Sequence, residues 1–513
     1  LFVKDIKIIY KGLVKMTTFK HVTQPDILLY INGEFVESEA GATFENYNPF
    51  TNEVINIVQE GRKEDIDKAV AAAREAFDNG PWRTMKLKER MNYIYRIADL
   101  IDEEIEKIAY LESLDTGLPI KQTRNMVSRA SENFRFYAGM VESRLVGDAY
   151  QVDENFINYT INVPVGVAGL ITPWNAPFML ETWKVAPALA TGNTVVLKPA
   201  EFSPLSANLL AQIIDKAGLP KGVFNVVHGY GETAGDALVK HRDVQLISFT
   251  GETVTGSTIM KNAADTLKEL SMELGGKSPI IVFDDADFDR ALDAAIWGIF
   301  SFNGERCTAN SRLFLQDGIK DKFIEALKER VQNVKIGDPL DETTEVGPLI
   351  HKEHYDKVVS YLKIAEEEGA EVLTREIPDE YKRGNFVAPT MIVNVENSMR
   401  VAQEEIFGPV LTVMSFKEEE EVIKLANDVE YGLAGYVWTN DIKRAHRVAH
   451  NIEAGMIWVN SQNVRDLRTP FGGMKTSGIG REGGHYGFDF YTEKKIIHVA
   501  IGNHPIPQFG KSK

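Results

Sequence analysis

The sequence contains one cysteine, Cys307, within the stretch NGERCTANSR. A lone cysteine is by default a small buried hydrophobe. Here an apolar stretch with helical spacing, residues 291–302, comes first, and Asn303 and Gly304 then interrupt the pattern. We therefore expect the thiol on a turn, where its sulfur and its backbone N–H can face one ligand. A nucleophilic role requires a nearby base or cation, because an ordinary cysteine titrates at about 8.5.

Two further polar residues have settings that suit acid–base or oxyanion chemistry. Glu273 lies between Met272 and Leu274, and two glycines follow. Partial desolvation of this carboxyl group raises its pKa and favours a general base near neutral pH, although most glutamates are solvated surface residues. Asn175, in ITPWNAPF, follows a strand-like stretch. Its amide is either a donor for a developing oxyanion or an ordinary turn former.

Other segments have the residue types of a dinucleotide site. Lys198 and Glu201 follow a strand-like run in VVLKPAEFSP. A lysine there binds ribose or phosphate oxygens, and a glutamate binds ribose hydroxyls while repelling a 2′-phosphate. Gly251 and Gly256 in FTGETVTG suit a pyrophosphate at a helix N-terminus. This spacing is not the G-x-G-x-x-G fingerprint, and the stretch HGYGETAG, with Gly231, is an equally weak signal.

Alternating strand-like and helix-like segments must position these residues. Apolar spacing predicts a helix over 64–77 and one long or two consecutive helices over 88–117. Strands are predicted at 165–173, 193–199 and 244–251, and a helical segment follows each of them. This alternation predicts an α/β fold with a parallel sheet that binds ligands at the carboxyl ends of its strands.

A second alternating series extends from about residue 277 to 475, so two α/β units are expected. Two alternating β segments, residues 155–164 and 494–502, belong to neither series. Exposed strand edges seek partners. We therefore expect these segments to pair with each other or with another subunit.

Composition and charge exclude several classes of protein. The chain is 44% hydrophobic and 26% charged, which is typical of soluble globular proteins. A formal net charge of −17 argues against nucleic-acid binding, and no apolar stretch is long enough for a membrane span. A single cysteine fits a reducing compartment, so a cytoplasmic protein is expected. No metal site is predicted, and residues 1–15 are expected to be an extension upstream of a start at Met16.

The order and spacing of these motifs resemble the NAD(P)-dependent aldehyde dehydrogenase superfamily. The similarity covers about residues 25–500 and is carried by PWNAPF, TVVLKPAEFSP, FTGETVTG, MELGGKSP, NGERCTANSR, EEIFGPV and PFGGMKTSGIGREGG. It implies that Cys307 is the nucleophile and Glu273 the general base, with Asn175 and the Cys307 N–H as the oxyanion hole. Family members that transfer the acyl group to coenzyme A lack this glutamate, so its presence favours hydrolysis.

The resemblance also implies a cofactor, NAD rather than NADP, and its binding residues. Lys198 and Glu201 would hold the adenosine ribose, and Glu405 with Phe407 the nicotinamide half. The full predicted set is Thr172, Pro173, Trp174, Lys198, Glu201, Gly231, Gly251, Glu252, Gly256, Leu274, Glu405 and Phe407.

The architecture implied by the family is two Rossmann-like parallel α/β domains plus a small β oligomerisation element. The predicted NAD-binding domain comprises residues 16–144 and 164–276, and the predicted catalytic domain residues 277–487. The oligomerisation element comprises residues 145–163 and 488–513, in a homodimer or homotetramer.

Three arginines are candidates for binding a small, anionic aldehyde substrate. Arg465 and Arg468 lie in NVRDLRTPFGG, which resembles the substrate-mouth loop of the family, and Arg124 lies in a segment that resembles the tunnel wall. Each is equally well explained as a surface ion pair. The motifs most closely resemble the muconic semialdehyde branch, whose acidic conjugated substrates would need such cations. Betaine aldehyde dehydrogenases share part of the pattern but should use aromatic and acidic residues instead.

Two other classes of protein remain as alternatives. A non-catalytic binding protein on the same fold is free to lose its nucleophile, base or oxyanion donor, yet all three positions are filled. A cysteine hydrolase without a cofactor would not need the pair formed by Lys198 and Glu201.

Overall fold

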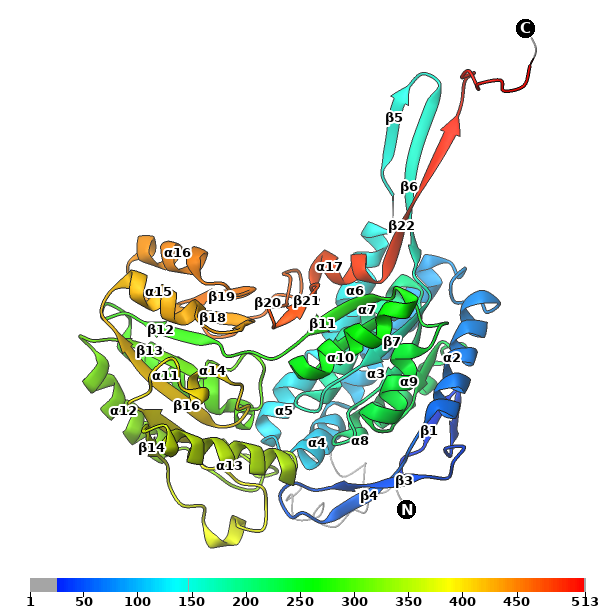
Figure 1. The fold of residues 1–513 in the computed structure, drawn as a ribbon. Coiled ribbons are helices and arrows are strands. Elements are labelled where there is room, and N and C mark those ends of the chain that lie inside the picture. Colours follow the sequence, from blue (N-terminus) through cyan, green and yellow to red (C-terminus); the bar gives the residue numbers. More distant parts are fainter. Residues whose placement is uncertain (1–24, 146, 512–513) are drawn as a thin grey trace.

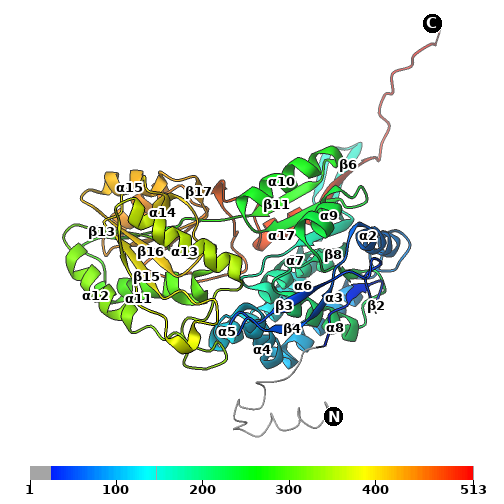
Figure 2. The same ribbon diagram turned by 60° about the horizontal axis from the view of Figure 1, so that its bottom comes forward.

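The chain folds into two α/β lobes that lie side by side, and a narrow β arm projects from one of them (Figure 1). The computed structural model describes residues 25–145 and 147–511, so the expected extension at residues 1–15 lies outside the described part. The view in Figure 2 shows the same two lobes from another direction. The α/β fold predicted from the sequence is confirmed.

The first lobe is built on an eight-stranded sheet in the order β2-β1-β9-β8-β7-β10-β11-β21. Strands β9, β8, β7, β10 and β11 are parallel, whereas β1, β2 and β21 are antiparallel to their neighbours. The predicted strands correspond to β7, β8 and β10. The strands are β1 (Leu29–Ile31), β2 (Glu34–Val36), β7 (Val167–Ile171), β8 (Thr194–Lys198), β9 (Phe224–Val226), β10 (Leu246–Thr250), β11 (Glu269–Glu273) and β21 (Gly478–Ile479).

Helices cover both faces of this sheet because its strands are buried on both sides. The predicted helix over 64–77 is α2, and the segment 88–117 forms two consecutive helices, α3 and α4. Gly117 ends α4 in the left-handed conformation, with φ of 76°, that favours glycine. The helices are α2 (Lys63–Asp78), α3 (Leu87–Glu103), α4 (Ile105–Thr116), α5 (Ile120–Val127), α6 (Ala130–Arg144), α7 (Pro177–Thr191), α8 (Pro204–Ala217), α9 (Asp236–Lys240), α10 (Thr253–Ala263) and α17 (Gly484–Phe490).

The second lobe is built on a seven-stranded sheet in the order β14-β15-β16-β13-β12-β18-β19, parallel except for β14. Its strands are β12 (Pro279–Val282), β13 (Arg312–Gln316), β14 (Glu371–Leu373), β15 (Thr390–Val393), β16 (Val410–Phe416), β18 (Ala434–Trp438) and β19 (Met456–Val459). Its helices are α11 (Phe288–Phe300), α12 (Lys320–Gln332), α13 (Lys352–Glu367), α14 (Arg400–Gln403), α15 (Glu419–Asn427) and α16 (Ile442–Asn451).

Three short ribbons complete the fold. Strands β3 (Thr43–Tyr47) and β4 (Val54–Gln59) form a hairpin, and β17 (Tyr431–Gly432) pairs with β20 (Met474–Lys475). The projecting arm consists of β5 (Ala149–Asp153), β6 (Phe156–Pro164) and β22 (Thr492–Ala500), and β22 is antiparallel to β6 along its whole length. The expected pairing of the two separate β segments is therefore confirmed.

The chain returns to the first lobe before it reaches the arm. The domain prediction places residues 277–487 together in the catalytic domain. Strand β21, however, pairs with β11 of the first sheet, and α17 packs against α6 and α7. A two-residue strand has no periodicity of its own, so the sequence pattern does not reveal this crossing.

Two negative observations apply to residues 25–145 and 147–511. No helix there combines the length and the apolar character that a bilayer crossing needs. No group of three histidine, cysteine, aspartate or glutamate side chains is arranged to bind a metal ion.

Candidate active site

Cys307 lies just beyond a distorted turn that ends α11. The helix stops at Phe300, earlier than the expected break, and Phe302 and Asn303 adopt left-handed φ angles of 57° and 56°. The buried Asn303 side chain stabilises this conformation, because it donates to the carbonyls of Gly117 and Pro348 and accepts from Gly347 N. The turn is therefore held by groups from two other loops, and it leaves Cys307 partly exposed.

Asn175 is brought beside this turn from the first lobe. It follows β7, its side chain is buried, and its Nδ2 donates to the Glu305 carbonyl at 2.8 Å. The amide is thus fixed within two residues of Cys307, and its second N–H remains for a ligand. This geometry suits a donor for an oxyanion that forms next to the cysteine sulfur.

Glu273 is the last residue of β11 and is 3% exposed. Neither carboxyl oxygen has a hydrogen-bond partner among the described residues. Burial, and next the charge of Glu482, raise the pKa of Glu273 well above its ordinary value. Gly472 passes so close that an added Cβ would lie 2.7 Å from Glu273 Oε1. The carboxyl group is therefore desolvated in a confined site, a setting that suits a general base.

The electrostatic surroundings of Cys307 oppose its ionisation. Burial raises the pKa of the thiol to about 12, and the carboxylates of Glu405 and Glu273 add to this effect. The positive charges of Arg306 and Arg465 act in the opposite direction. A nearby base is consequently required for thiolate chemistry at neutral pH.

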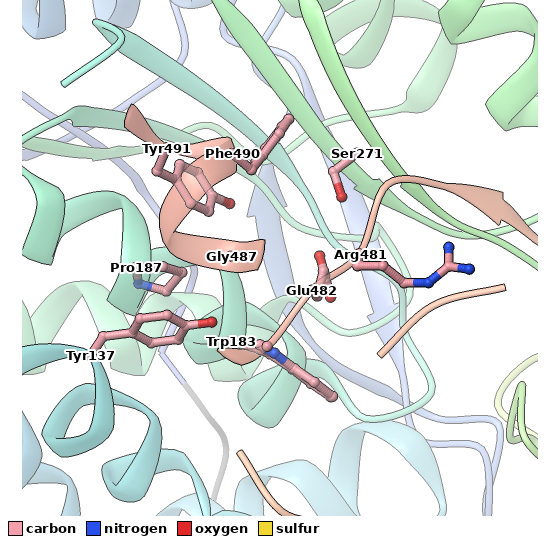
Figure 3. Close-up of a pocket in the computed structure, with 10 residues that line it drawn as sticks. Tyr137, Trp183, Pro187, Ser271, Arg481, Glu482, Gly487, Phe490 and Tyr491 are labelled. Carbon is pink, nitrogen blue, oxygen red and sulfur yellow. The ribbon is translucent and has the colours of Figure 1, made fainter. Parts of the chain in front are cut away.

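A buried ion pair next to Glu273 was not predicted from the sequence. Lys184 Nζ contacts Glu482 and donates to Ser248 Oγ at 2.8 Å. Figure 3 shows Glu482 beside Trp183 and Ser271, which line a cavity of about 10 Å³. The charge of Glu482 raises the pKa of Glu273, and that of Lys184 lowers it. A lysine within the largely apolar helix α7, which also carries Glu181, is the sequence signal that could have revealed this pair.

The predicted cofactor residues line the carboxyl ends of the first sheet. Lys198 ends β8 and its Nζ lies 3.2 Å from Glu201 Oε2. Gly251 follows β10. Gly256 packs so closely on Leu274 that an added Cβ would lie 2.7 Å from a methyl carbon of the leucine. Gly231 begins a π-helical turn, and nothing lies within 4 Å of a Cβ added to it.

The start of α10 fits a phosphate group. Its N-cap residue, Glu252, makes no side-chain capping hydrogen bond, so it leaves the first N–H groups of the helix available for an anion. The Glu252 carboxylate instead pairs with Lys357 on α13 at 3.1 Å and connects the two lobes. The residues present therefore fit a dinucleotide at this edge of the sheet.

The second lobe supplies the other predicted cofactor residues. Glu405 Oε1 accepts from Gly276 N at 2.8 Å, and burial raises the pKa of this carboxyl group to about 7. Phe407 adopts a φ of 61° and packs edge-on against Trp174, with ring centroids 5.3 Å apart. Thr172 and Pro173 precede Trp174 at the end of β7, and the Thr172 hydroxyl is buried without a partner in the described structure.

His351 is a further residue beside the predicted ribose site. Its ring stacks on that of Phe202, with the ring centroids 3.8 Å apart. Burial lowers the pKa of His351 to about 4, although the charge of Glu201 partly offsets this effect. A single histidine in a loop gives no sequence signal for this placement.

The three candidate arginines have different environments. Arg124 pairs with Glu106 and Glu342, and Arg468 is exposed and pairs with Asp466. Both therefore form the surface ion pairs that the alternative interpretation describes.

Arg465, in contrast, lies over two aromatic rings beside the cysteine. Its guanidinium carbon is 4.1 Å from the Trp183 ring centroid and 4.3 Å from that of Phe471. Burial and, next, the charge of Arg129 lower the pKa of Arg465 to about 9. Arg129 has no distinguishing sequence signal, because its segment resembles any amphipathic helix end.

Comparisons with known proteins agree with this geometry. The model of the aldehyde dehydrogenase family matches residues 35–497. The chain is 52% identical over 464 residues to the 5-carboxymethyl-2-hydroxymuconate semialdehyde dehydrogenase of Escherichia coli, covering 89% of this chain and 97% of that protein.

Solved structures show the same similarity. HpcC from Thermus thermophilus superposes with a TM-score of 0.92 at 51% identity, covering 95% of each chain. The betaine aldehyde dehydrogenase of Staphylococcus aureus, in complex with NAD+, superposes with a TM-score of 0.93 at 42% identity, covering 97% of this chain and 98% of that one. The chain therefore belongs to the aldehyde dehydrogenase family, and it is an enzyme that oxidises aldehydes with a nicotinamide cofactor.

Proposed function

We propose that the enzyme oxidises 5-carboxymethyl-2-hydroxymuconate semialdehyde, an anionic product of aromatic catabolism in 4-hydroxyphenylacetate (homoprotocatechuate) breakdown, to the carboxylic acid with NAD. The observation that carries the proposal is the pair formed by Arg465 and Arg129 near Cys307. Among the described residues, neither guanidinium forms an ion pair with a carboxylate. Two uncompensated, partly desolvated cations favour a carboxylate ligand, which guanidinium groups bind in bidentate fashion.

The chemistry assigned to the chain's own residues follows from their placement. Glu273 takes the thiol proton of Cys307 and passes it to solvent, and the thiolate sulfur then bonds to the aldehyde carbon. The aldehyde oxygen becomes an oxyanion that accepts hydrogen bonds from Asn175 Nδ2 and the Cys307 N–H. Bound NAD supplies the hydride acceptor that converts the adduct into a thioester. Glu273 then removes a proton from water, which attacks the thioester carbon. The acid leaves and the Cys307 thiol is restored.

The choice of NAD over NADP rests on Glu201. Its carboxylate lies 3.2 Å from the Lys198 ammonium at the proposed adenosine ribose site. A carboxylate there accepts hydrogen bonds from ribose hydroxyls and repels a 2′-phosphate. Because a nucleophilic thiol must stay reduced, we place the enzyme in the cytoplasm.

The arm is the proposed oligomerisation element, in a homodimer or homotetramer. Several large apolar side chains on its three strands are exposed in the single chain: Tyr150, Ile157, Tyr159, Ile496 and Val499. Projecting strands with exposed apolar side chains favour pairing with another subunit.

Alternative substrates are distinguished by their charge. 2-Hydroxymuconic and 2-aminomuconic semialdehydes carry a carboxylate and fit the same arginine pair. Betaine aldehyde carries a quaternary ammonium group, which Arg465 and Arg129 would repel. The present cations therefore favour the acidic aldehydes.

A substrate panel tests the proposal. We expect kcat/KM, measured as NADH formation, to be highest for 5-carboxymethyl-2-hydroxymuconate semialdehyde and lowest for betaine aldehyde, with simple aliphatic aldehydes between them. Arg465→Met should lower kcat/KM for the acidic semialdehyde by about 10- to 100-fold, which is the usual strength of a hydrogen bond to a charged group. Cys307→Ala should abolish all turnover.

Similar kcat/KM values for the three aldehyde classes would contradict the substrate assignment. Arg447→Met serves as the matched control, because Arg447 pairs with Glu419 on the surface of the second lobe. It should change none of the three values.

A further inference from the structure

Arg306, the residue before the nucleophile, has a buried guanidinium that the protein only partly satisfies. The residue is 9% exposed, and its guanidinium carbon lies 4.9 Å from the Trp297 ring centroid and 5.6 Å from that of Phe302. One nitrogen, Nη2, donates to the Gly298 carbonyl at 2.6 Å. Nε and Nη1 are buried and have no acceptor among the described residues. Buried charged donors without an acceptor are unfavourable, so a ligand is the natural acceptor.

Gln462 provides a second unsatisfied group at the same place. It follows β19 in the loop that also carries Arg465, and both its Nε2 and its Oε1 are buried without a partner in the described structure. A Cβ added to Gly298 would lie 2.4 Å from Gln462 Nε2. Arg306 and Gln462 therefore contact the same glycine of α11, although the two residues come from distant segments.

The Arg306 charge also acts directly on the reaction centre. Among the cations around Cys307, Arg306 lowers the pKa of the thiol more than Arg465 does. No carboxylate of the described chain forms an ion pair with the Arg306 guanidinium. The active site thus has two separate cationic groups. One is Arg306 next to the sulfur, and the other is Arg465, which lies over the rings of Trp183 and Phe471 and feels the charge of Arg129.

We propose that Arg306, assisted by Gln462, binds a second substrate carboxylate, one attached through a short arm to the carbon next to the aldehyde. This inference rests on the proposed function. In 5-carboxymethyl-2-hydroxymuconate semialdehyde the carboxymethyl group is on that carbon, and 2-hydroxymuconate semialdehyde has hydrogen there. Nε and Nη1, the two nitrogens without an acceptor, point to different sides of the planar guanidinium, so the carboxymethyl carboxylate accepts a charge-assisted hydrogen bond from one of them. Arg465 and Arg129 then hold the remote carboxylate that both aldehydes share, and Arg306 sets the preference between them.

The test compares the two semialdehydes in the unmodified enzyme, Arg306→Met, Arg306→Lys and the surface control Arg447→Met. Loss of Arg306 also removes a cation that favours the thiolate, so a general decrease in rate is expected for both substrates. The readout is therefore the ratio of the two kcat/KM values. We expect Arg306→Met to lower the preference for the carboxymethyl substrate by about 10- to 100-fold, and Arg306→Lys to restore part of it. The Arg447→Met ratio should stay unchanged.

An unchanged ratio in Arg306→Met would overturn the inference and leave the proposed function intact. Failure of the unmodified enzyme to oxidise either semialdehyde would instead refute the proposed function.

A binding measurement covers the case in which Arg306→Met is inactive. Calorimetry compares the acid products 5-carboxymethyl-2-hydroxymuconate and 2-hydroxymuconate on Cys307→Ala with and without Arg306→Met. Only the carboxymethyl acid should bind more weakly, by about 10-fold or more, when Arg306 is replaced. Equal weakening of both acids, or no weakening of either, would reject the inference.

Discussion

At the scale of single residues, the reaction centre consists of buried ionisable groups whose pKa values are raised. Burial and the carboxylates of Glu405 and Glu273 raise the pKa of the Cys307 thiol to about 12. Burial and the charge of Glu482 raise the pKa of Glu273. Only the thiolate and the carboxylate perform the proposed steps, and each form is lost as the pH falls through its raised pKa. The activity should therefore increase from neutral to alkaline pH.

Replacing Glu482 should move the acidic limb of this profile. Glu482→Gln removes a negative charge that raises the pKa of Glu273, so the carboxylate should persist to lower pH. We expect the limb in log kcat/KM against pH to shift downward by about one unit, within the range that one nearby charge produces. Glu37→Gln, on the exposed surface of the first lobe, is the control. A limb that stays in place in Glu482→Gln would show that Glu482 does not act on Glu273.

At the scale of elements, buried carboxyl groups join three helices of the first lobe. Glu112 on α4 is fully buried and neither of its oxygens has a partner in the described structure, and Glu181 on α7 accepts from Ser206 of α8 at 2.9 Å. Asp115 accepts from Asn46 Nδ2 and from Leu205 N at the start of α8. Burial raises the pKa of Glu112 well above its ordinary value, and that of Glu181 to about 8.

Glu112→Gln should stabilise the protein at alkaline pH. A carboxyl group whose pKa is raised in the folded chain binds protons more tightly there than in the unfolded chain. The free energy of unfolding therefore falls as the pH rises above the ordinary glutamate pKa of 4.5. The variant stays neutral and should flatten this decline, with a gain of about 1–3 kcal/mol near pH 8 and little change near pH 5. Thermal unfolding measured across this pH range checks the effect. A variant that is equally or less stable than the unmodified chain at alkaline pH would contradict it.

At the scale of the whole molecule, the candidate site is assembled between the two lobes. Asn175 follows β7 and Glu273 ends β11 of the first sheet, and Cys307 and Glu405 come from the second lobe. The chain crosses from the first lobe to the second at Gly275 and Gly276. A Cβ added to Gly275 would lie 2.3 Å from Glu405 Oε2, and one added to Gly276 would lie 2.7 Å from the Cys307 carbonyl oxygen. The glycines that follow the proposed base therefore allow the second lobe to approach it closely.

The arm provides a prediction at the same scale. Ile157→Lys combined with Ile496→Lys places two charges on exposed apolar positions of β6 and β22. We expect the mass measured by light scattering to fall toward that of a single chain, because a subunit interface disfavours unpaired lysines. Ile442→Lys, at a 68% exposed position on α16, is the matched control and should leave the mass unchanged. An unchanged mass in the double variant would exclude the arm from the interface.

Local sequence patterns determined much of this protein. The strand–helix alternation around 165–250 predicted the parallel sheet, because burial on both faces requires apolar runs that end in turn residues. The motif residues Cys307, Glu273 and Asn175 were identifiable because few residue types perform nucleophilic, basic or oxyanion chemistry. Their order along the chain indicated the family, which the comparisons then confirmed.

The tertiary structure alone decided which charged residues meet. Arg124, Arg465 and Arg468 are equivalent as sequence signals, yet only Arg465 lies over Trp183 and Phe471 beside the cysteine. The ion pair of Lys184 with Glu482 joins residues 298 positions apart. The physical reason is that burial and charge pairing depend on distances in the folded chain, whereas a sequence pattern reports only the neighbours within one helix or strand.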